Sequence, residues 1–391
     1  MTSEKLNDFE TSKSFENFEH LLKNPISIAS RAIECGPRFL NWRWQMRQQI
    51  KSRADMEKWQ LKLIGAENFE VTEEIFEVGI TPYYALLMGQ EIDDPIRVQA
   101  LPQTFELIDA LGVRDPLREV DHSTVPEVVH VYPDRVAFCV AQLCPVYCRY
   151  CFRKRRDEVA GLHFNRGIIE RGVDYIQRNP AIRDVLITGG DPFIASDEAI
   201  DQLLEKIRAI PHVEIIRFGT RTPVTLPYRI TDNLVKILAK YHPIFVNTHF
   251  NCVEELTPDA QCAVLKLVDA GIPVGNQSVL LRHVNDTYEK MLALLRGLLK
   301  VRIRPYYLFH PHAVEGTAHL RVSLTVGLEI MRRLRGTITG LGIPSYIIDT
   351  PSGKVPILPD YQLSRDKQDL ILVNPRGEIH REFGAFDSFT D

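Results

Sequence analysis

From Val136 onward, short runs of β-branched and aromatic residues alternate with longer segments whose apolar positions recur at helical spacing. The candidate strands are residues 136–140, 185–188, 215–218, 244–247, 273–277, 303–308 and 346–349. Candidate helices between them are 167–177, 197–209, 232–241, 258–270, 288–300 and 323–334. Strands that alternate with helices in this way predict βα units and a parallel sheet. Six or so such units favour an α/β fold of the partial TIM-like (β/α) barrel type over a doubly wound sheet.

The residues before Val136 show a different pattern of polar and apolar positions. Residues 1–24 are polar with mixed charge, which is typical of a mobile lead-in. Segments 39–47 and 81–88 have helical spacing, and prolines interrupt the pattern up to about residue 130. We therefore expect an N-terminal helical region over 1–130, a barrel core over 131–350 and a short C-terminal segment over 351–391. The N-terminal region is expected to pack on the barrel or on a partner subunit.

Composition narrows the class of protein. The chain has 391 residues, 45% of them hydrophobic and 25% charged, with a formal net charge of −4. This balance argues against a protein that coats nucleic acid. No apolar run approaches the ~18 residues of a membrane-spanning helix, and the first residues lack the apolar segment of a signal peptide. We therefore expect a cytoplasmic enzyme with no membrane or nucleic-acid partner.

Polar, glycine and cysteine residues gather where the predicted strands end. They are Cys144, Gly189, Gly190, Asp191, Thr220, Arg221, His249, Asn276, Gln277, His312 and Asp349. Barrel enzymes carry their active sites at the carboxyl ends of the strands. The pattern therefore predicts a site at that mouth of the barrel.

Three cysteines of this set lie within eight residues, at Cys144, Cys148 and Cys151. Iron–sulfur cubanes usually take four thiolates, so three would leave one iron open for chemistry. Two other interpretations are three unrelated buried thiols, or a zinc site with His163 as a fourth ligand. The chain has seven cysteines, an odd number that does not suit a disulfide framework. The other four, Cys35, Cys139, Cys252 and Cys262, are expected in the core.

The spacing Cys-x3-Cys-x2-Cys resembles the signature of radical S-adenosylmethionine (SAM) enzymes. The resemblance implies a [4Fe–4S] cluster whose open iron is chelated by SAM, which is cleaved reductively to a 5′-deoxyadenosyl radical. Gly189-Gly190-Asp191 resembles the motif of these enzymes that meets the methionine amino group, on a turn expected to expose Asp191. Asn276 and Gln277 are similar to another segment that lines SAM.

From about Trp42 to its end the chain resembles the lysine 2,3-aminomutase family of isomerases. The segments that carry this resemblance include residues 41–45, 80–84, 132–136, 219–224, 247–251, 275–281 and 304–307. It implies that Lys354 forms a Schiff base with pyridoxal phosphate (PLP) and that Arg153 binds the substrate α-carboxylate. Tyr132 and Arg135 match a segment near PLP. The family also implies a small amino-acid substrate, a flavodoxin or ferredoxin as electron donor, and a homo-oligomer.

The sequence departs from the lysine enzymes in four places. Asp349 matches one of two aspartates that bind the distal ammonium of the substrate, but His312 stands at the other. Val131 replaces an arginine, which removes a possible phosphate contact. The glycine run before Lys354 is shorter, and the cysteine-rich tail that binds zinc is missing, so we predict no structural zinc. In the basic run at 153–156, Lys154 and the residues after it are expected to be solvated.

These patterns predict a radical SAM, PLP-dependent aminomutase that moves the α-amino group of an amino acid to its β-carbon. Because Asp349 would repel a second carboxylate, basic substrates should outperform glutamate. Two alternatives remain open at this point. One is the same scaffold acting on a protein-linked lysine or a secondary-metabolite precursor. The other is an iron–sulfur or zinc binding module without turnover.

Overall fold

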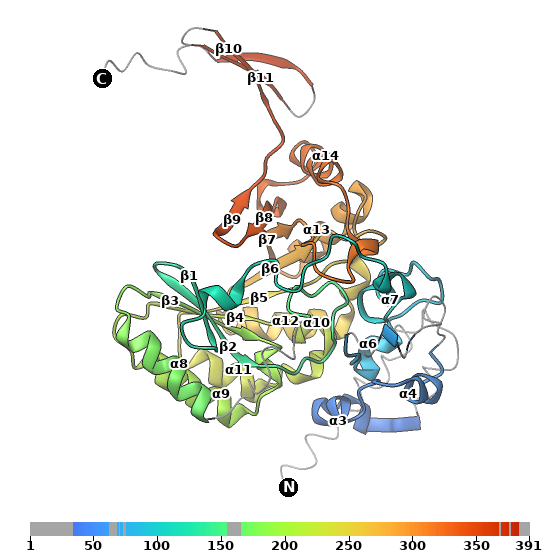
Figure 1. Cartoon of the computed structure of the whole chain (residues 1–391), viewed down its shortest axis with the longest axis vertical. Helices are drawn as coiled ribbons and strands as arrows, with labels where there is room; N and C mark the ends of the chain where they lie inside the picture. The colour runs from blue at the N-terminus through green and yellow to red at the C-terminus, as the bar shows by residue number, and fades with distance from the viewer. Residues whose placement is uncertain are drawn as a thin grey trace.

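The computed structural model describes residues 34–61, 69, 71–72, 76–154, 166–366, 369–374 and 377–382. Residues 1–24, for which a mobile lead-in was predicted, lie outside this part of the chain. Two sheets are present, one of nine strands in the order β1 to β9 and one of three strands in the order β10 to β12. Figure 1 shows the larger sheet with helices around it and the smaller sheet apart from it.

The larger sheet forms a nearly closed barrel. Its strands are β1 (Val128–Tyr132), β2 (Arg135–Ala141), β3 (Asp184–Gly189), β4 (Ile215–Gly219), β5 (Ile244–Thr248), β6 (Val274–Val279), β7 (Arg304–Phe309), β8 (Ser345–Thr350) and β9 (Gly353–Pro356). Strands β2 to β8 are parallel, and β1 and β9 are antiparallel edges. All seven predicted strands are confirmed. The two edge strands were not predicted.

Helices cover the outside of the barrel. They are α8 (Arg166–Arg178), α9 (Asp197–Arg208), α11 (Asp232–Ala239), α12 (Pro258–Asp269), α13 (Tyr288–Lys300) and α14 (Leu324–Arg335). They confirm the six predicted helices. Ser196 and Thr231 cap the first turns of α9 and α11 with side-chain oxygens, as amphipathic helices require at their amino ends. Gly172 lets α8 approach β2, because a Cβ there would lie 2.2 Å from the Phe138 ring.

Short helical turns connect these elements. They are α10 (Thr222–Thr225), η6 (Pro192–Ile194), η7 (Pro227–Arg229), η8 (Val253–Glu255), η9 (Ala318–Leu320) and η10 (Gly340–Gly342). Most of them follow the carboxyl end of a strand, where the loops carry the polar residues. The barrel nearly closes at this end, where the Lys354 backbone N–H of β9 donates a 2.7 Å hydrogen bond to the Tyr132 hydroxyl of β1.

In its described part the N-terminal region consists of short helices, and helices lie within both segments, 39–47 and 81–88, for which they were expected. They are α3 (Trp42–Arg47), α4 (Arg53–Lys58), α6 (Pro82–Leu86), α7 (Arg97–Ala100), η2 (Gly36–Leu40), η3 (Thr104–Leu107) and η4 (Glu119–His122). Proline interrupts them repeatedly. The region packs on the barrel, as expected. Thr81 Oγ1 donates to the Thr225 carbonyl at 2.6 Å, and the Tyr84 hydroxyl donates to Glu255 at 2.7 Å.

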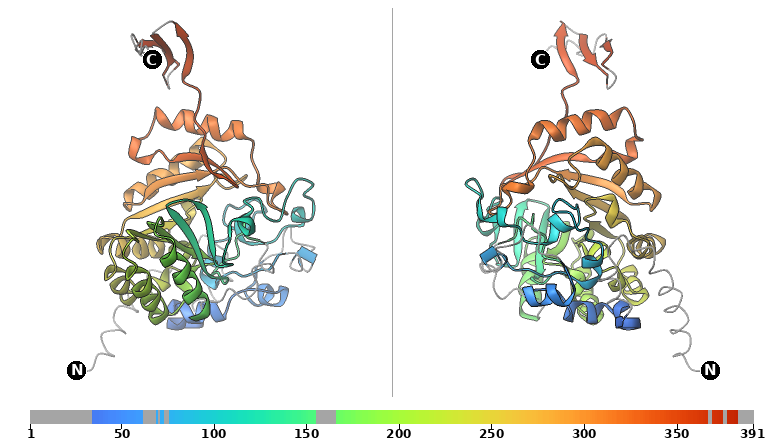
Figure 2. Two further views of the ribbon diagram at one scale, coloured as in Figure 1. Left: turned by 60° about the vertical axis from the view of Figure 1, so that its left-hand side comes forward. Right: turned by 90° about the vertical axis from the view of Figure 1, so that its right-hand side faces the viewer.

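Beyond β9 the chain forms a small antiparallel sheet of β10 (Gln362–Asp366), β11 (Asp369–Val373) and β12 (Ile379–Glu382). It projects away from the barrel in all views (Figures 1 and 2). The sequence analysis did not predict these strands. Within the described part of the chain, every helix is too short or too polar to cross a lipid bilayer.

Candidate active site

The loop after β2 carries Cys144, Cys148 and Cys151, and each of the three is partly exposed. The N-terminal region holds this loop through the backbone. Gln49 Nε2 donates to the Cys144 carbonyl at 2.7 Å, and the Arg149 N–H donates to the Gln99 carbonyl at 2.8 Å. The conformation of the loop therefore depends on residues that lie far away in the sequence.

A buried ion-pair cluster anchors the same loop. Arg149 donates to both carboxylate oxygens of Glu106, at 2.8 and 2.6 Å, and Lys154 lies 3.2 Å from one of them. The expectation that Lys154 is solvated is therefore wrong, because its side chain is buried against Glu106. Burial lowers the pKa of Lys154 to about 8, although Glu106 acts in the opposite direction. Arg155 and Arg156 lie outside the described residues.

The three thiols lie on one loop and are the kind of ligand that an iron–sulfur cluster takes, whereas His163, the possible fourth ligand of a zinc site, lies outside the described residues. Among the described residues, no three His, Cys, Asp or Glu side chains are placed to hold one metal ion. A cluster does not require that, because it offers several irons to separate thiolates. Of the other cysteines, Cys139 and Cys252 are buried as expected and Cys35 is partly exposed. Cys262 is exposed on α12, so its expected place in the core is wrong.

Gly189 and Gly190 let the turn after β3 pack under the cysteine loop. Gly189 has a φ of +116°, and a Cβ on Gly190 would lie 2.5 Å from the backbone of Gln142. The Gly190 N–H donates to the Ala141 carbonyl, and the Asp191 N–H donates to the Leu143 carbonyl at 2.8 Å. The two loops are thus joined backbone to backbone.

Asp191 is buried, with 3% of its surface exposed, so the expectation that the turn exposes it is wrong. Its carboxylate accepts hydrogen bonds from Thr220 Oγ1 at 2.6 Å, from the Arg221 N–H at 2.8 Å and from the Phe193 N–H at 3.1 Å. These donors tie the end of β3 to the end of β4. Burial raises the pKa of Asp191. A role of its side chain in binding SAM stays a prediction.

Asn276 has a similar internal task. Its Oδ1 accepts from the Phe250 N–H at 2.7 Å and its Nδ2 donates to the Phe250 carbonyl at 3.0 Å. It is 1% exposed, so its amide holds the loop after β5 against β6. Gln277, the next residue of β6, is partly exposed. Contact of either residue with SAM stays a prediction.

Across the mouth, four predicted residues come together around β8 and β9. Lys354 stands opposite Asp349 in the register, and its Nζ lies 2.9 Å from the carboxylate. The Tyr132 hydroxyl accepts from the Lys354 backbone N–H, and the guanidinium of Arg135 lies 3.7 Å above the Tyr132 ring. A lysine, a phenol and an arginine thus lie close together between β9 and the hairpin of β1 and β2.

His312 joins this group to the cysteine loop. Its ring lies 5.5 Å from that of Phe152, the residue after Cys151. Burial lowers the pKa of His312, while Asp349 acts to raise it. The ring is therefore neutral near neutral pH. Its Nε2 is buried and has no hydrogen-bond partner among the described residues.

Arg153 lies beside Thr188 and Gly189 at the end of β3, with Nη1 3.4 Å from each of their oxygens. Its Nε and Nη2 bind the carboxylate of Glu119 at 2.7 to 3.1 Å. Glu119 was not predicted from the sequence, because it lies in an ordinary charged stretch before the barrel. Arg221 was predicted only as a residue at a strand end. Its position between two threonines directly after β4 was the sequence feature that could have indicated a role in the site.

Comparison with known proteins identifies the family of this barrel. Residues 139–295 match the Radical SAM superfamily, and residues 331–382 match the Lysine-2,3-aminomutase family model. L-lysine 2,3-aminomutase of Clostridium subterminale is 41% identical over 87% of this chain and 83% of its own. Glutamate 2,3-aminomutase of Clostridioides difficile is 39% identical over 87% of this chain and 81% of its own.

The chain belongs to the lysine 2,3-aminomutase family. As a radical SAM aminomutase it is an isomerase that shifts an amino group and uses a [4Fe–4S] cluster, SAM and PLP. Both resemblances and the fold predicted from the sequence are confirmed. The first family match contains the three cysteines and the second contains Lys354. The residues at the mouth fit these cofactors, since thiols, a lysine amine and an arginine are the groups that bind iron and a pyridoxal phosphate.

Proposed function

We propose that this enzyme moves the α-amino group of a free amino acid to the β-carbon and that it prefers a basic side chain, as in lysine. The observation that carries the proposal is the contact between Phe152 and His312 at 5.5 Å. It supports a cysteine loop that approaches Asp349 and Lys354, because both of these residues act electrostatically on the His312 ring. A radical formed at a cluster on that loop would therefore arise next to an amino acid held at Lys354.

We assign the residues of the mouth as follows. Cys144, Cys148 and Cys151 bind the cluster, and Lys354 binds PLP near Tyr132 and Arg135. Arg153 offers a planar fork of donors that suits the α-carboxylate of the substrate. When bound, the cluster and SAM supply a 5′-deoxyadenosyl radical, and PLP supplies a carbon that carries the migrating nitrogen. The surrounding barrel positions the amino acid and limits access of water.

The preference for a basic side chain follows from charge. Asp349 is negative and only 11% exposed, and His312 beside it is neutral because burial lowers its pKa. The second carboxylate of a substrate such as glutamate would be repelled by the negative charge of Asp349. Lys354 is the cation that pairs with Asp349 in this structure, and it would not offset this repulsion once its amine is engaged by PLP. A distal ammonium would meet a carboxylate. The pocket thus favours lysine, ornithine or arginine over glutamate.

A screen of free amino acids tests this proposal. Anaerobic, reconstituted enzyme with SAM, PLP and dithionite would be given lysine, arginine, ornithine, glutamate or alanine, and β-amino products would be measured. We expect a basic amino acid to react fastest. Faster reaction of glutamate would overturn the pocket assignment. Reaction of a lysylated protein with no free amino acid turned over would favour the protein-linked alternative. Absence of SAM cleavage would favour a binding module.

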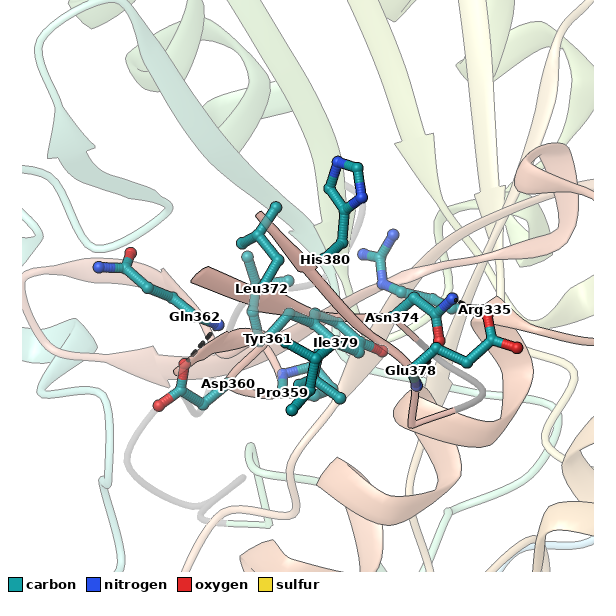
Figure 3. A pocket seen from close by; sticks show the side chains of 12 residues that line it. Arg335, Pro359, Asp360, Tyr361, Gln362, Leu372, Asn374, Glu378, Ile379 and His380 are labelled. Atoms are coloured by element: carbon teal, nitrogen blue, oxygen red, sulfur yellow. Dashed lines mark hydrogen bonds between the residues drawn. The ribbon is translucent and has the colours of Figure 1, made fainter. Parts of the chain in front are cut away.

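We also propose a homo-oligomer that is joined through the small sheet of β10 to β12. Leu363 and Ile379 of this sheet are 53% and 72% exposed. A pocket of about 800 Å³ lies between this sheet and Arg335 at the end of α14, and Tyr361 and Ile379 contribute to its lining (Figure 3). A sheet of three strands needs an apolar face covered to be stable, and a second copy would cover it.

One further partner and a location follow from the chemistry and remain proposals. Reduction of the cluster requires an electron donor of the flavodoxin or ferredoxin type. Because three thiols committed to iron need a reducing compartment, we also propose a cytoplasmic location.

A further inference from the structure

Arg221 donates a hydrogen bond to the sulfur of Cys148. The arginine follows β4, its side chain is 9% exposed, and its Nη1 lies 2.9 Å from Cys148 Sγ. The contact joins the cysteine loop, which follows β2, to the end of β4, on the far side of β3.

Other N–H groups of the Arg221 guanidinium are also held by hydrogen bonds. Nη2 binds Glu255 Oε1 at 2.5 Å and Gln99 Oε1 at 2.7 Å, and Nε donates to the His249 carbonyl at 3.2 Å. Glu255 is itself fully buried and accepts a further hydrogen bond from Tyr84. Because these partners occupy the guanidinium, it cannot turn away from the sulfur without breaking several buried hydrogen bonds.

A hydrogen bond to a ligating sulfur changes the energy of the cluster. Hydrogen bonds to the sulfurs are among the factors that set the reduction potential of an iron–sulfur cluster. Reduction adds negative charge, which is shared with the thiolates. An N–H that carries part of a positive charge therefore stabilises the reduced cluster more than the oxidised one.

We propose that Arg221 is a positioning residue that orients Cys148 and raises the reduction potential of the cluster. This inference deepens the proposed function, because it rests on the assignment of Cys148 as a cluster ligand. Glu255, Gln99 and Tyr84 hold the guanidinium in place for this task. The proposed effect concerns the transfer of an electron to the cluster, which precedes any reaction of the amino acid.

The test compares Arg221→Gln and Arg221→Lys with the wild type. Each protein is reconstituted anaerobically with iron and sulfide, its iron content is measured, and the cluster is titrated by electron paramagnetic resonance without SAM or amino acid. At a fixed potential we expect the ratio of reduced to oxidised cluster to fall about tenfold in Arg221→Gln, equal to ~59 mV for one electron. Arg221→Lys, which keeps the charge but not the fork, should lie between the two.

Arg229→Gln is the matched control, because Arg229 is equally buried but pairs with Asp197 and with backbone carbonyls of η6 and the residue after it. Its cluster should titrate like the wild type. An unchanged potential in both Arg221 variants at full iron content would overturn the proposal. If Arg221→Gln does not retain four irons, the potential of Arg221→Lys alone tests the proposal, and an unchanged potential overturns it. Full cluster retention in Cys148→Ala, whose side chain cannot bind iron, would instead refute the ligand assignment, and with it this part of the proposed function.

Discussion

Glu119 fills the guanidinium fork of Arg153. Both oxygens of the carboxylate are engaged, with Nε 2.9 and 3.1 Å from them and Nη2 2.7 Å from one. The pair is largely buried, with side chains 19% and 12% exposed. Arg153 is the residue that we propose for the substrate α-carboxylate. An amino acid must therefore displace Glu119 or share the fork with it.

Glu119→Gln should strengthen substrate binding. The amide keeps the shape of the side chain but removes the competing charge, so we expect the dissociation constant of the amino acid to fall about tenfold. Binding can be followed by the change in PLP absorbance when the amino acid is added. Asp121→Asn is the control, since Asp121 lies in the same turn but pairs with exposed Arg118. Weaker binding in Glu119→Gln would show that Glu119 orients Arg153 instead of competing for it.

His312→Asp should raise activity on lysine. It places a second carboxylate beside Asp349, and two carboxylates neutralise a distal ammonium better than one carboxylate and a neutral ring. We expect kcat/KM for lysine to rise about tenfold and that for alanine to stay constant. His310→Gln is the control, because His310 faces Tyr346, with Nδ1 2.8 Å from its hydroxyl. A variant that gained activity on glutamate would place the distal pocket elsewhere.

Periodicity was sufficient to predict the barrel. All seven parallel strands and six outer helices follow from apolar spacing, because each packs one face in the core. The edge strands β1 and β9 were missed, since they are short and β9 depends on pairing across the turn before Lys354. The strands β10 to β12 were missed for a related reason. Each of them has five residues or fewer and pairs with its neighbour in sequence, so its apolar pattern is too short to identify a strand.

The candidate site was predicted less completely than the fold. Strand ends identified most of its residues, and the resemblance supplied their roles. The environment of each side chain could not be predicted. Asp191 was expected to be exposed and Lys154 solvated, yet both are buried by partners distant in the sequence, Thr220 and Glu106. Glu119 was missed because only the folded chain brings it to Arg153.

Lys354→Ala should abolish the absorbance that PLP acquires when it binds a lysine of the enzyme. The lysine amine is the only part of the proposed PLP site that can form this bond. Titration of the purified variant with PLP, followed by its absorption spectrum, checks the prediction. Lys300→Ala, at the exposed end of α13, should behave as the wild type. An unchanged spectrum in Lys354→Ala would remove Lys354 from this role.

His319→Phe should make the protein more resistant to acid. The ring is buried near Phe105, neither nitrogen has a hydrogen-bond partner among the described residues, and burial lowers its pKa to about 4. Its charged neighbours are Glu106, Lys154, Arg149 and Asp109. Because the unfolded chain binds a proton at higher pH than the folded one, stability falls as pH drops from about 6.5 to 4.

This loss should amount to roughly 2 to 3 kcal/mol in the wild type. In His319→Phe it should be absent, so the difference in free energy of unfolding between pH 6.5 and 4 should shrink by about that amount. Urea unfolding at both pH values measures it. His283→Asn, at a half-exposed histidine, is the control and should retain the wild-type dependence. The same pH dependence in His319→Phe would mean that other groups cause the acid sensitivity.

Leu363→Asp combined with Ile379→Asp should convert the proposed oligomer to a monomer. Both side chains lie exposed on the small sheet, at 53% and 72%, and a carboxylate at each would have to be desolvated in an interface between two copies. In size-exclusion chromatography coupled to light scattering, we expect the molar mass to fall from a multiple of 44.8 kDa to that of one copy. Leu341→Asp, at an equally exposed leucine on the barrel, should leave the mass unchanged. A mass that stays the same in the double variant would place the interface away from the small sheet.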